Sequence, residues 1–129
     1  MREAWKHLYV HVPFCDGKCG YCGFYSELYS PDKASRYLDA LAREIDLRGP
    51  GRPKPKVETL YFGGGTPSIL SARELEALCK LVTKRVNARY IREWTVEANP
   101  GTLSAEKLRI LSEAGVDLIM TGHVHVPFA

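Results

Sequence analysis

Residues 8–24 read LYVHVPFCDGKCGYCGF, and this stretch decides how the rest of the sequence is interpreted. Its first part, residues 8–12, is apolar like a buried parallel strand, and Pro13 ends the run. The loop that follows carries three of the four cysteines in the spacing C-x3-C-x2-C: Cys15, Cys19 and Cys22. Iron–sulfur clusters are held by cysteine thiolates, normally four of them. Three thiolates on one loop therefore predict a four-iron cluster in which one iron lacks a protein ligand and can bind another molecule.

The spacing alone does not exclude two other uses of these cysteines, a disulfide framework and a zinc site. A disulfide framework needs an oxidising compartment, and residues 1–7 are charged, with no apolar signal segment after them. A zinc site would combine the three thiolates with His11 as the fourth ligand. Zinc sites usually pair two C-x2-C knuckles, and this sequence has a single C-x2-C. The spacing therefore favours a cluster over zinc, and zinc over disulfides.

Composition and charge exclude several classes of function. The chain has 129 residues, of which 45% are hydrophobic and 26% charged, as in an ordinary globular domain. A net charge of +3 and the lack of a basic run interleaved with aromatics argue against nucleic-acid binding. No apolar run approaches the length of a transmembrane helix. We expect a single soluble domain over residues 1–129, located in the reducing cytoplasm.

Strand-like and helix-like segments alternate along the chain. The strand-like segments are apolar runs at 8–12, 57–62, 94–98 and 116–120. The three amphipathic helices between them are predicted to begin after serine caps, namely Ser30, Ser71 and Ser104. Cys79 falls within the apolar stripe of the second helix and is expected to be a core residue, not a ligand. This alternation predicts an α/β fold with a parallel sheet and right-handed crossovers.

Three chemical features stand at the predicted carboxyl ends of these strands, where parallel α/β folds place their sites. The cysteine loop follows the first strand, the run GGGTP at 63–67 follows the second, and Glu97 closes the third. Glycines allow the backbone to approach a ligand closely, and no Lys-Ser/Thr follows to make a P-loop. Each feature alone has a plain structural explanation: a tight turn for the glycines and a solvated carboxylate for Glu97.

Taken together, the three motifs resemble those of radical S-adenosylmethionine (radical SAM) proteins. The segments YVHVPFC at 9–15 and CGYCGF at 19–24 are similar to the oxygen-independent coproporphyrinogen III oxidases and to their HemW-type relatives, the haem chaperones. The oxidases carry a further cysteine two residues after the third one. Phe24 occupies that position in this sequence, which favours the HemW-like branch.

The resemblance implies a 4Fe–4S cluster and S-adenosylmethionine (SAM) as cofactors. It assigns the cluster ligands to Cys15, Cys19 and Cys22, and SAM chelates the remaining iron through its amino and carboxylate groups. Tyr21 is expected to pack beside the cluster and the adenine. The implied chemistry is reductive cleavage of SAM to a 5′-deoxyadenosyl radical, as in an oxidoreductase of the coproporphyrinogen oxidase type.

The remaining motifs are assigned to SAM by the same resemblance. Tyr9 is expected to line the cofactor site. Gly64, Gly65 and Thr66 are expected to hold the methionine end of SAM. Glu97 is expected to accept hydrogen bonds from the ribose hydroxyls, because a carboxylate can accept both protons of a vicinal diol.

The resemblance weakens near the end of the chain. Residues 117–129 read DLIMTGHVHVPFA and lack the Gly-Val-Gln-Ser-Phe-like segment of the family, so this tail is atypical. His123 and His125 would share one face of a strand, but without a third ligand an exposed terminus is favoured over a metal site. Family members are much longer, with a partial TIM-like β/α barrel and a C-terminal domain to which haem binding is assigned. We expect residues 1–129 to be about half of such a barrel, from a truncated chain.

Three functional hypotheses follow. The first is the N-terminal part of a radical SAM protein of porphyrin or haem metabolism, with hydrogen abstraction or haem handling supplied by the parent protein. The second is a non-catalytic module that binds zinc or a cluster. The third is an inactive remnant. Haem or porphyrin is an expected partner only through parts that this sequence lacks, and no nucleic-acid partner and no transmembrane segment are expected.

Overall fold

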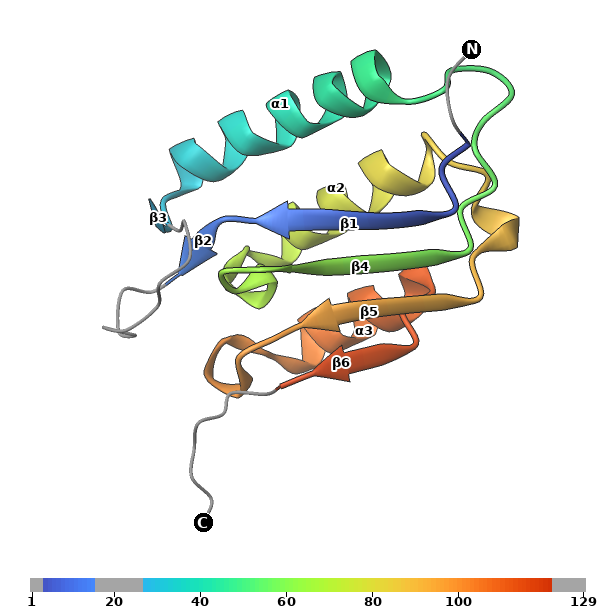
Figure 1. Ribbon diagram of the computed structural model, residues 1–129. Helices are drawn as coiled ribbons and strands as arrows, with labels where there is room; N and C mark the ends of the chain where they lie inside the picture. Colours follow the sequence, from blue (N-terminus) through green and yellow to red (C-terminus); the bar gives the residue numbers. More distant parts are fainter. Residues whose placement is uncertain (1–3, 16–26, 122–129) are drawn as a thin grey trace.

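The computed structural model describes residues 4–15 and 27–121. Within them the chain forms a four-stranded parallel sheet of order β1-β4-β5-β6 (Figure 1). The bounds of its strands are β1 His7–Val12, β4 Thr59–Gly64, β5 Glu93–Glu97 and β6 Leu118–Met120. A second, two-stranded parallel sheet joins β2 (Phe14–Cys15) to β3 (Glu27–Leu28) just beyond the end of β1.

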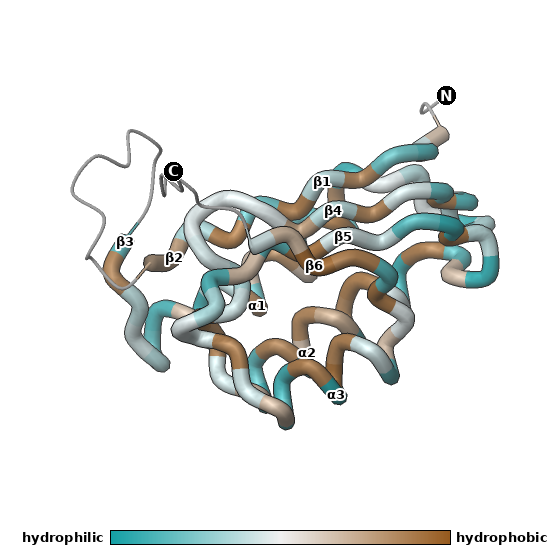
Figure 2. Tube along the Cα trace, turned by 90° about the horizontal axis from the view of Figure 1, so that it is seen from below, coloured by the Kyte–Doolittle hydropathy of each residue, from teal (hydrophilic) through white to brown (hydrophobic). Residues whose placement is uncertain are grey.

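Three α-helices connect and cover the sheet: α1 Pro31–Arg48, α2 Ala72–Thr83 and α3 Ala105–Ala114. Short 3₁₀ helices follow the strands or precede them: η1 Pro67–Ile69, η2 Ala88–Tyr90 and η3 Pro100–Thr102. Figure 2 shows all three α-helices on one face of the sheet, so no helix of the described chain covers the other face. The structure confirms the predicted α/β fold with a parallel sheet, here as an open sheet and not a closed barrel.

Two strands begin two residues later than predicted, the other two begin one residue earlier, and one small sheet was not predicted. The second strand was expected at 57–62 but spans Thr59–Gly64, because Gly63 and Gly64 continue the ladder opposite His11 and Val12 of β1. The last strand begins at Leu118 and not at 116, because the N–H of Val116 is still bonded to the carbonyl of Leu111 in α3. The β2–β3 pair was not predicted, since two-residue strands leave no periodic signal.

Local sequence signals fix where the helices begin and end. The side chains of all three predicted caps accept a hydrogen bond from the first turn of their helices: Ser30, Ser71 and Ser104. At Ser71 the bond is reciprocal, because the Glu74 carboxylate accepts from the Ser71 N–H at 2.9 Å. Gly115 ends α3 with φ +112°, a left-handed conformation that favours glycine.

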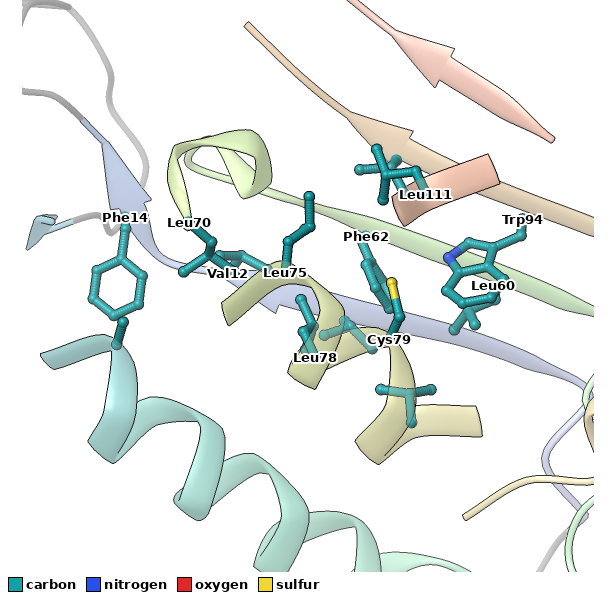
Figure 3. Packing of buried hydrophobic residues seen from close by; sticks show 14 of the residues in the cluster. Val12, Phe14, Leu60, Phe62, Leu70, Leu75, Leu78, Cys79, Trp94 and Leu111 are labelled. Carbon is teal, nitrogen blue, oxygen red and sulfur yellow. The ribbon is translucent and has the colours of Figure 1, made fainter. Parts of the chain in front are cut away.

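The hydrophobic core lies between the sheet and the helices, and Figure 3 shows its packing. Phe62 of β4 packs edge-on against Trp94 of β5, with ring centroids 5.4 Å apart. From α2, Leu78 and Cys79 are buried against the sheet. Burial raises the pKa of the Cys79 thiol to about 12, so this thiol is protonated and unreactive at neutral pH. The structure thus confirms Cys79 as a core residue.

The described part of the chain contains no helix that is both long and apolar enough to span a bilayer.

The capping box of α2 gives a first test of the fold. Replacing Ser71 by Ala removes the acceptor for the Glu74 N–H, and we expect it to lower the free energy of unfolding by about 1 kcal/mol. Urea unfolding of both proteins measures the difference. Ser112→Ala, an exposed serine inside α3, is the control and should not destabilise; equal stability of the two variants would contradict the capping role of Ser71.

Candidate cofactor site

The carboxyl ends of β1, β4 and β5 lie at the same edge of the sheet, and β2 continues the chain beyond β1 at that edge (Figure 1). The segments that follow these strands contain the three motifs singled out in the sequence. Parallel pairing in register therefore brings together the start of the cysteine loop at Cys15, the glycine run and Glu97. The contacts between them define the candidate site.

The glycine run is bonded directly to the segment that leads into the cysteine loop. The N–H of Gly65 donates to the carbonyl of Val12 at 2.9 Å, and the N–H of Thr66 donates to the carbonyl of Phe14 at 2.7 Å. A Cβ atom at position 65 would collide with the Phe14 carbonyl. Glycine at 65 is therefore required by the close approach of two backbones, and this approach places the run next to Cys15.

On its other side the glycine run holds Glu97. The N–H of Gly64 donates to Oε1 of Glu97 at 3.2 Å. Gly64 has φ +112°, and a Cβ atom there would lie 2.7 Å from Nδ1 of His11. Both the backbone conformation and the available space therefore require glycine at position 64. One short run thus connects the cysteine segment to the acidic residue that ends β5.

A tyrosine that was not among the predicted site residues completes this contact. The hydroxyl of Tyr61 donates to Oε2 of Glu97 at 2.6 Å. The ring of Tyr61 is stacked on that of Tyr9, with centroids 5.7 Å apart and planes inclined by 18°. Strand alternation puts both tyrosines on the side opposite the buried Val10 and Phe62, which is the sheet face that carries no helix (Figure 2), and Tyr9 is 55% exposed. The only sequence signal for Tyr61 is strand alternation, which puts it two residues before Gly63 on the same face.

Gly63 leaves the space in which these groups meet. A Cβ atom at position 63 would lie 2.9 Å from Cε1 of Tyr61, 2.9 Å from the hydroxyl of Tyr9 and 3.0 Å from Oε1 of Glu97. Three side chains from three neighbouring strands therefore converge on one glycine. The role of Gly63 is to leave room for these side chains, and the sequence motif alone did not indicate this role.

The electrostatics of the site keep its phenols neutral. The hydrogen bond to Glu97, with burial and the charge of the carboxylate, raises the pKa of Tyr61 to about 12. Burial and the same charge raise the pKa of Tyr9. At neutral pH both hydroxyl groups therefore remain protonated and can donate hydrogen bonds.

A second group of residues fixes the loop after the glycine run, and sequence reasoning missed it. The Ser68 hydroxyl is fully buried, accepts from the N–H of Asn99 at 2.9 Å and bonds to the Thr102 hydroxyl at 2.5 Å. The ammonium group of Lys107 donates to the carbonyls of Ser68 and Thr102, at 2.8 and 2.9 Å. The loop after β4 is therefore locked to the loop after β5.

The predicted metal ligands are only partly within the described residues. Cys15 is half-buried at the end of β2, and its carbonyl accepts from the N–H of Tyr29 at 3.0 Å. Cys19, Cys22 and Tyr21 lie outside the described residues, as do His123 and His125 of the tail. Within residues 4–15 and 27–121 no three His, Cys, Asp or Glu side chains are grouped so that they could hold a metal ion.

The donor and acceptor pattern of the described residues fits SAM. The N–H groups of Gly64, Gly65 and Thr66 are all used by acceptors of the protein itself. The polar backbone groups that Gly64 and Gly65 can offer a ligand are therefore their carbonyl oxygens, which accept from an ammonium group. The Thr66 carbonyl already accepts from the N–H of Ile69 at 2.9 Å, which leaves it one further acceptor site. The Glu97 carboxylate accepts from hydroxyl groups. The amino group and the ribose diol of SAM supply donors of these two kinds.

Comparisons with known proteins agree with this interpretation. A model of the radical SAM superfamily matches residues 9–125. The haem chaperone HemW of Lactococcus lactis is 38% identical over 122 residues, which are 95% of this chain and 31% of HemW. The HemW of Bacillus subtilis is 38% identical over 118 residues, 91% of this chain and 31% of its own. This chain therefore spans about a third of the length of these relatives.

A solved structure shows the same fold. Coproporphyrinogen III oxidase (HemN) from Escherichia coli, described as a radical SAM enzyme, superimposes with a TM-score of 0.81 at 34% identity. The match covers 94% of this chain and 28% of the oxidase. These comparisons confirm the resemblance to the coproporphyrinogen oxidase and HemW-type proteins that the motifs indicated.

The crowding around Gly63 predicts a large effect of a small substitution. Gly63→Ala should lower the free energy of unfolding by about 1–3 kcal/mol, because the new methyl group must displace Tyr61, Tyr9 or Glu97. Urea unfolding measures this. Gly101→Ala is the matched control, since its Cβ atom meets only Asn99 Oδ1 at an ordinary 3.5 Å. A Gly63→Ala protein as stable as the control would contradict the packing.

The bond between Tyr61 and Glu97 predicts a change in tyrosine titration. Glu97→Gln removes the negative charge that disfavours the phenolate, so the pKa of Tyr61 should fall from about 12 toward its ordinary value near 10. Tyrosinate absorbance against pH measures it, and Tyr61→Phe identifies the group by removing it. A titration that is unchanged in Glu97→Gln would show that the two groups are not in contact.

Proposed function

Because this chain belongs to the radical SAM superfamily, we propose that its sheet edge binds a 4Fe–4S cluster and SAM as part of a HemW-type protein. Family membership supports these two cofactors, as the sequence predicted. The observation that carries the proposal is the set of hydrogen bonds from Val12 and Phe14, just before Cys15, through Gly64–Thr66 to Glu97. These bonds support the proposal because they join the residues just before Cys15 to the glycine run and the glycine run to Glu97.

The cluster ligands in this proposal are Cys15, Cys19 and Cys22. Cys15 is anchored at the end of β2, which pairs with β3 and is bonded to the glycine run through Phe14. Tyr21 is proposed to pack beside the cluster and the adenine. Zinc bound by the same thiolates with His11 is the less favoured alternative, because the family match supports the cluster.

The SAM contacts are proposed for the described residues of the site. Carbonyl oxygens of the run Gly64, Gly65 and Thr66 would accept from the amino group of the methionine end. The Glu97 carboxylate would accept from the ribose hydroxyls. Tyr9, on the uncovered face beside the glycine run, would line the cofactor site with its ring.

When bound, a reduced 4Fe–4S cluster held by Cys15, Cys19 and Cys22 would supply the electron for reductive cleavage of SAM. The contribution of this chain is to orient the nucleoside and the methionine end at the same time. The lock between the loops after β4 and β5, made by Ser68 and Lys107, keeps the two sets of acceptors at a fixed separation. We propose a reaction that uses the 5′-deoxyadenosyl radical only for a whole HemW-type protein, and not for this chain by itself.

Haem or porphyrin is the proposed partner, on the strength of the relatives. The HemW relatives are haem chaperones by name, and Phe24, outside the described residues, stands where the oxidases carry a further cysteine. We propose that this chain supplies the cofactor domain of such a protein and that haem contacts lie in parts it does not include. Thiolate ligands need a reducing compartment, so the cytoplasm is the proposed location.

Anaerobic reconstitution with iron and sulfide tests the proposal. We expect about four irons per chain, as in a 4Fe–4S centre, and a visible spectrum that changes when SAM is added. Cys19→Ala should lose most of the iron and colour, because one of three protein ligands is gone. Cys79→Ala is the matched control and should keep them, since Cys79 is buried in the core. A colourless protein that binds zinc would overturn the proposal in favour of the zinc module.

A further inference from the structure

We propose that Tyr61 is a positioning residue for SAM, which acts by fixing the Glu97 carboxylate in the orientation that accepts the ribose diol. This inference rests on the proposed role of Glu97. Nothing in the motifs indicated Tyr61, which stands before the glycine run and not in it. The argument comes from the contacts of three groups on adjacent strands.

Glu97 is held at both of its carboxylate oxygens by donors of one strand. Oε2 accepts from the Tyr61 hydroxyl at 2.6 Å, and Oε1 accepts from the Gly64 N–H at 3.2 Å. Two bonds to the two oxygens define the plane of the carboxylate, whose terminal torsion is otherwise broad. Each oxygen has a further lone-pair site. A ribose hydroxyl can therefore bind each oxygen in addition to the donor from the protein.

Tyr61 is itself held in place, so it can act as a fixed donor. Its ring is stacked on Tyr9, and its hydroxyl lies 3.9 Å from Sδ of Met120 on β6. The small residue Gly63 lets the phenol reach Glu97 across the face of the sheet. The hydroxyl thus comes from a packed ring on a central strand, not from a free surface side chain.

Loss of this hydroxyl would leave Glu97 with the longer bond to Gly64. The carboxylate would then sample orientations in which only one oxygen faces a vicinal diol. The binding affinity would therefore fall for ligands that carry the diol and stay the same for ligands that lack it. A merely structural role of Tyr61 would instead weaken both kinds of ligand to the same extent.

The test uses Tyr61→Phe in the reconstituted 129-residue chain. Dissociation constants are measured for SAM and for a SAM analogue whose ribose lacks both hydroxyls. We expect SAM to bind about 2-fold to 12-fold more weakly, the range that corresponds to the net contribution of one ordinary hydrogen bond, and the analogue to bind as it does to the parent chain. Equal weakening of both ligands, unchanged SAM binding or tighter SAM binding would each overturn the inference.

Two further variants separate the possible causes. Tyr29→Phe removes another phenol–carboxylate bond, the 2.8 Å bond to Glu74, and should leave the ratio of the two dissociation constants unchanged. Glu97→Gln tests the underlying assignment. If Glu97→Gln keeps the parent preference for the diol, the ribose role of Glu97 fails; if it loses the preference while Tyr61→Phe keeps it, only the role of Tyr61 fails.

A measurement that needs no cluster complements this test. Thermal unfolding establishes that Tyr61→Phe is folded, as expected for a change that keeps the stacked ring. 5′-Deoxyadenosine carries the same diol, and its binding to the cluster-free chain should weaken by the same factor in Tyr61→Phe. Unaltered binding of 5′-deoxyadenosine to this variant would count against the inference.

Discussion

The backbone hydrogen bonds between Gly65, Thr66 and the segment 12–14 are the contacts on which the rest of the site depends. They extend the pairing of β1 with β4 beyond the ends of both strands. They hold the chain after β1 against the loop after β4. Because Phe14 precedes Cys15, they also set where the cysteine loop begins. A Cβ atom at position 65 would collide with the Phe14 carbonyl. These hydrogen bonds therefore require glycine at position 65.

Much of the fold could be predicted from the sequence because it depends on local signals. Serine caps, the left-handed Gly115 and apolar runs each act within a few residues, and the structure confirms them. Parallel pairing then followed from the alternation of strands and helices. What local signals could not predict were short or terminal features. The glycines at 63 and 64 extend β4 only because β1 lies opposite, and the β2–β3 pair forms only because the chain returns there.

The candidate site divides in the same way. Glu97 and the glycine run could be selected from the sequence, because their residue types and order match a known motif. Tyr61, Ser68 and Lys107 could not, because their partners lie on other elements, 36 residues from Tyr61 and 31 and 39 from Ser68. In the sequence these residues match no motif. Their supporting role can be recognised only when the positions of their partners on other elements are known. Supporting contacts of this kind are what convert a set of motifs into a site.

The two faces of the sheet have different roles, and this explains the location of the stacked tyrosines Tyr9 and Tyr61. The face toward the helices is filled by side chains such as Phe62 and Trp94, which leave no room for polar chemistry. Tyr9, Tyr61 and the Glu97 carboxylate that Tyr61 binds lie on the opposite face, where no helix of the described chain packs. There, rigidity comes from neighbouring strands, as the stacked tyrosines and the glycine beside them illustrate. The in-register pairing of β1, β4 and β5 thus serves both the core and the site.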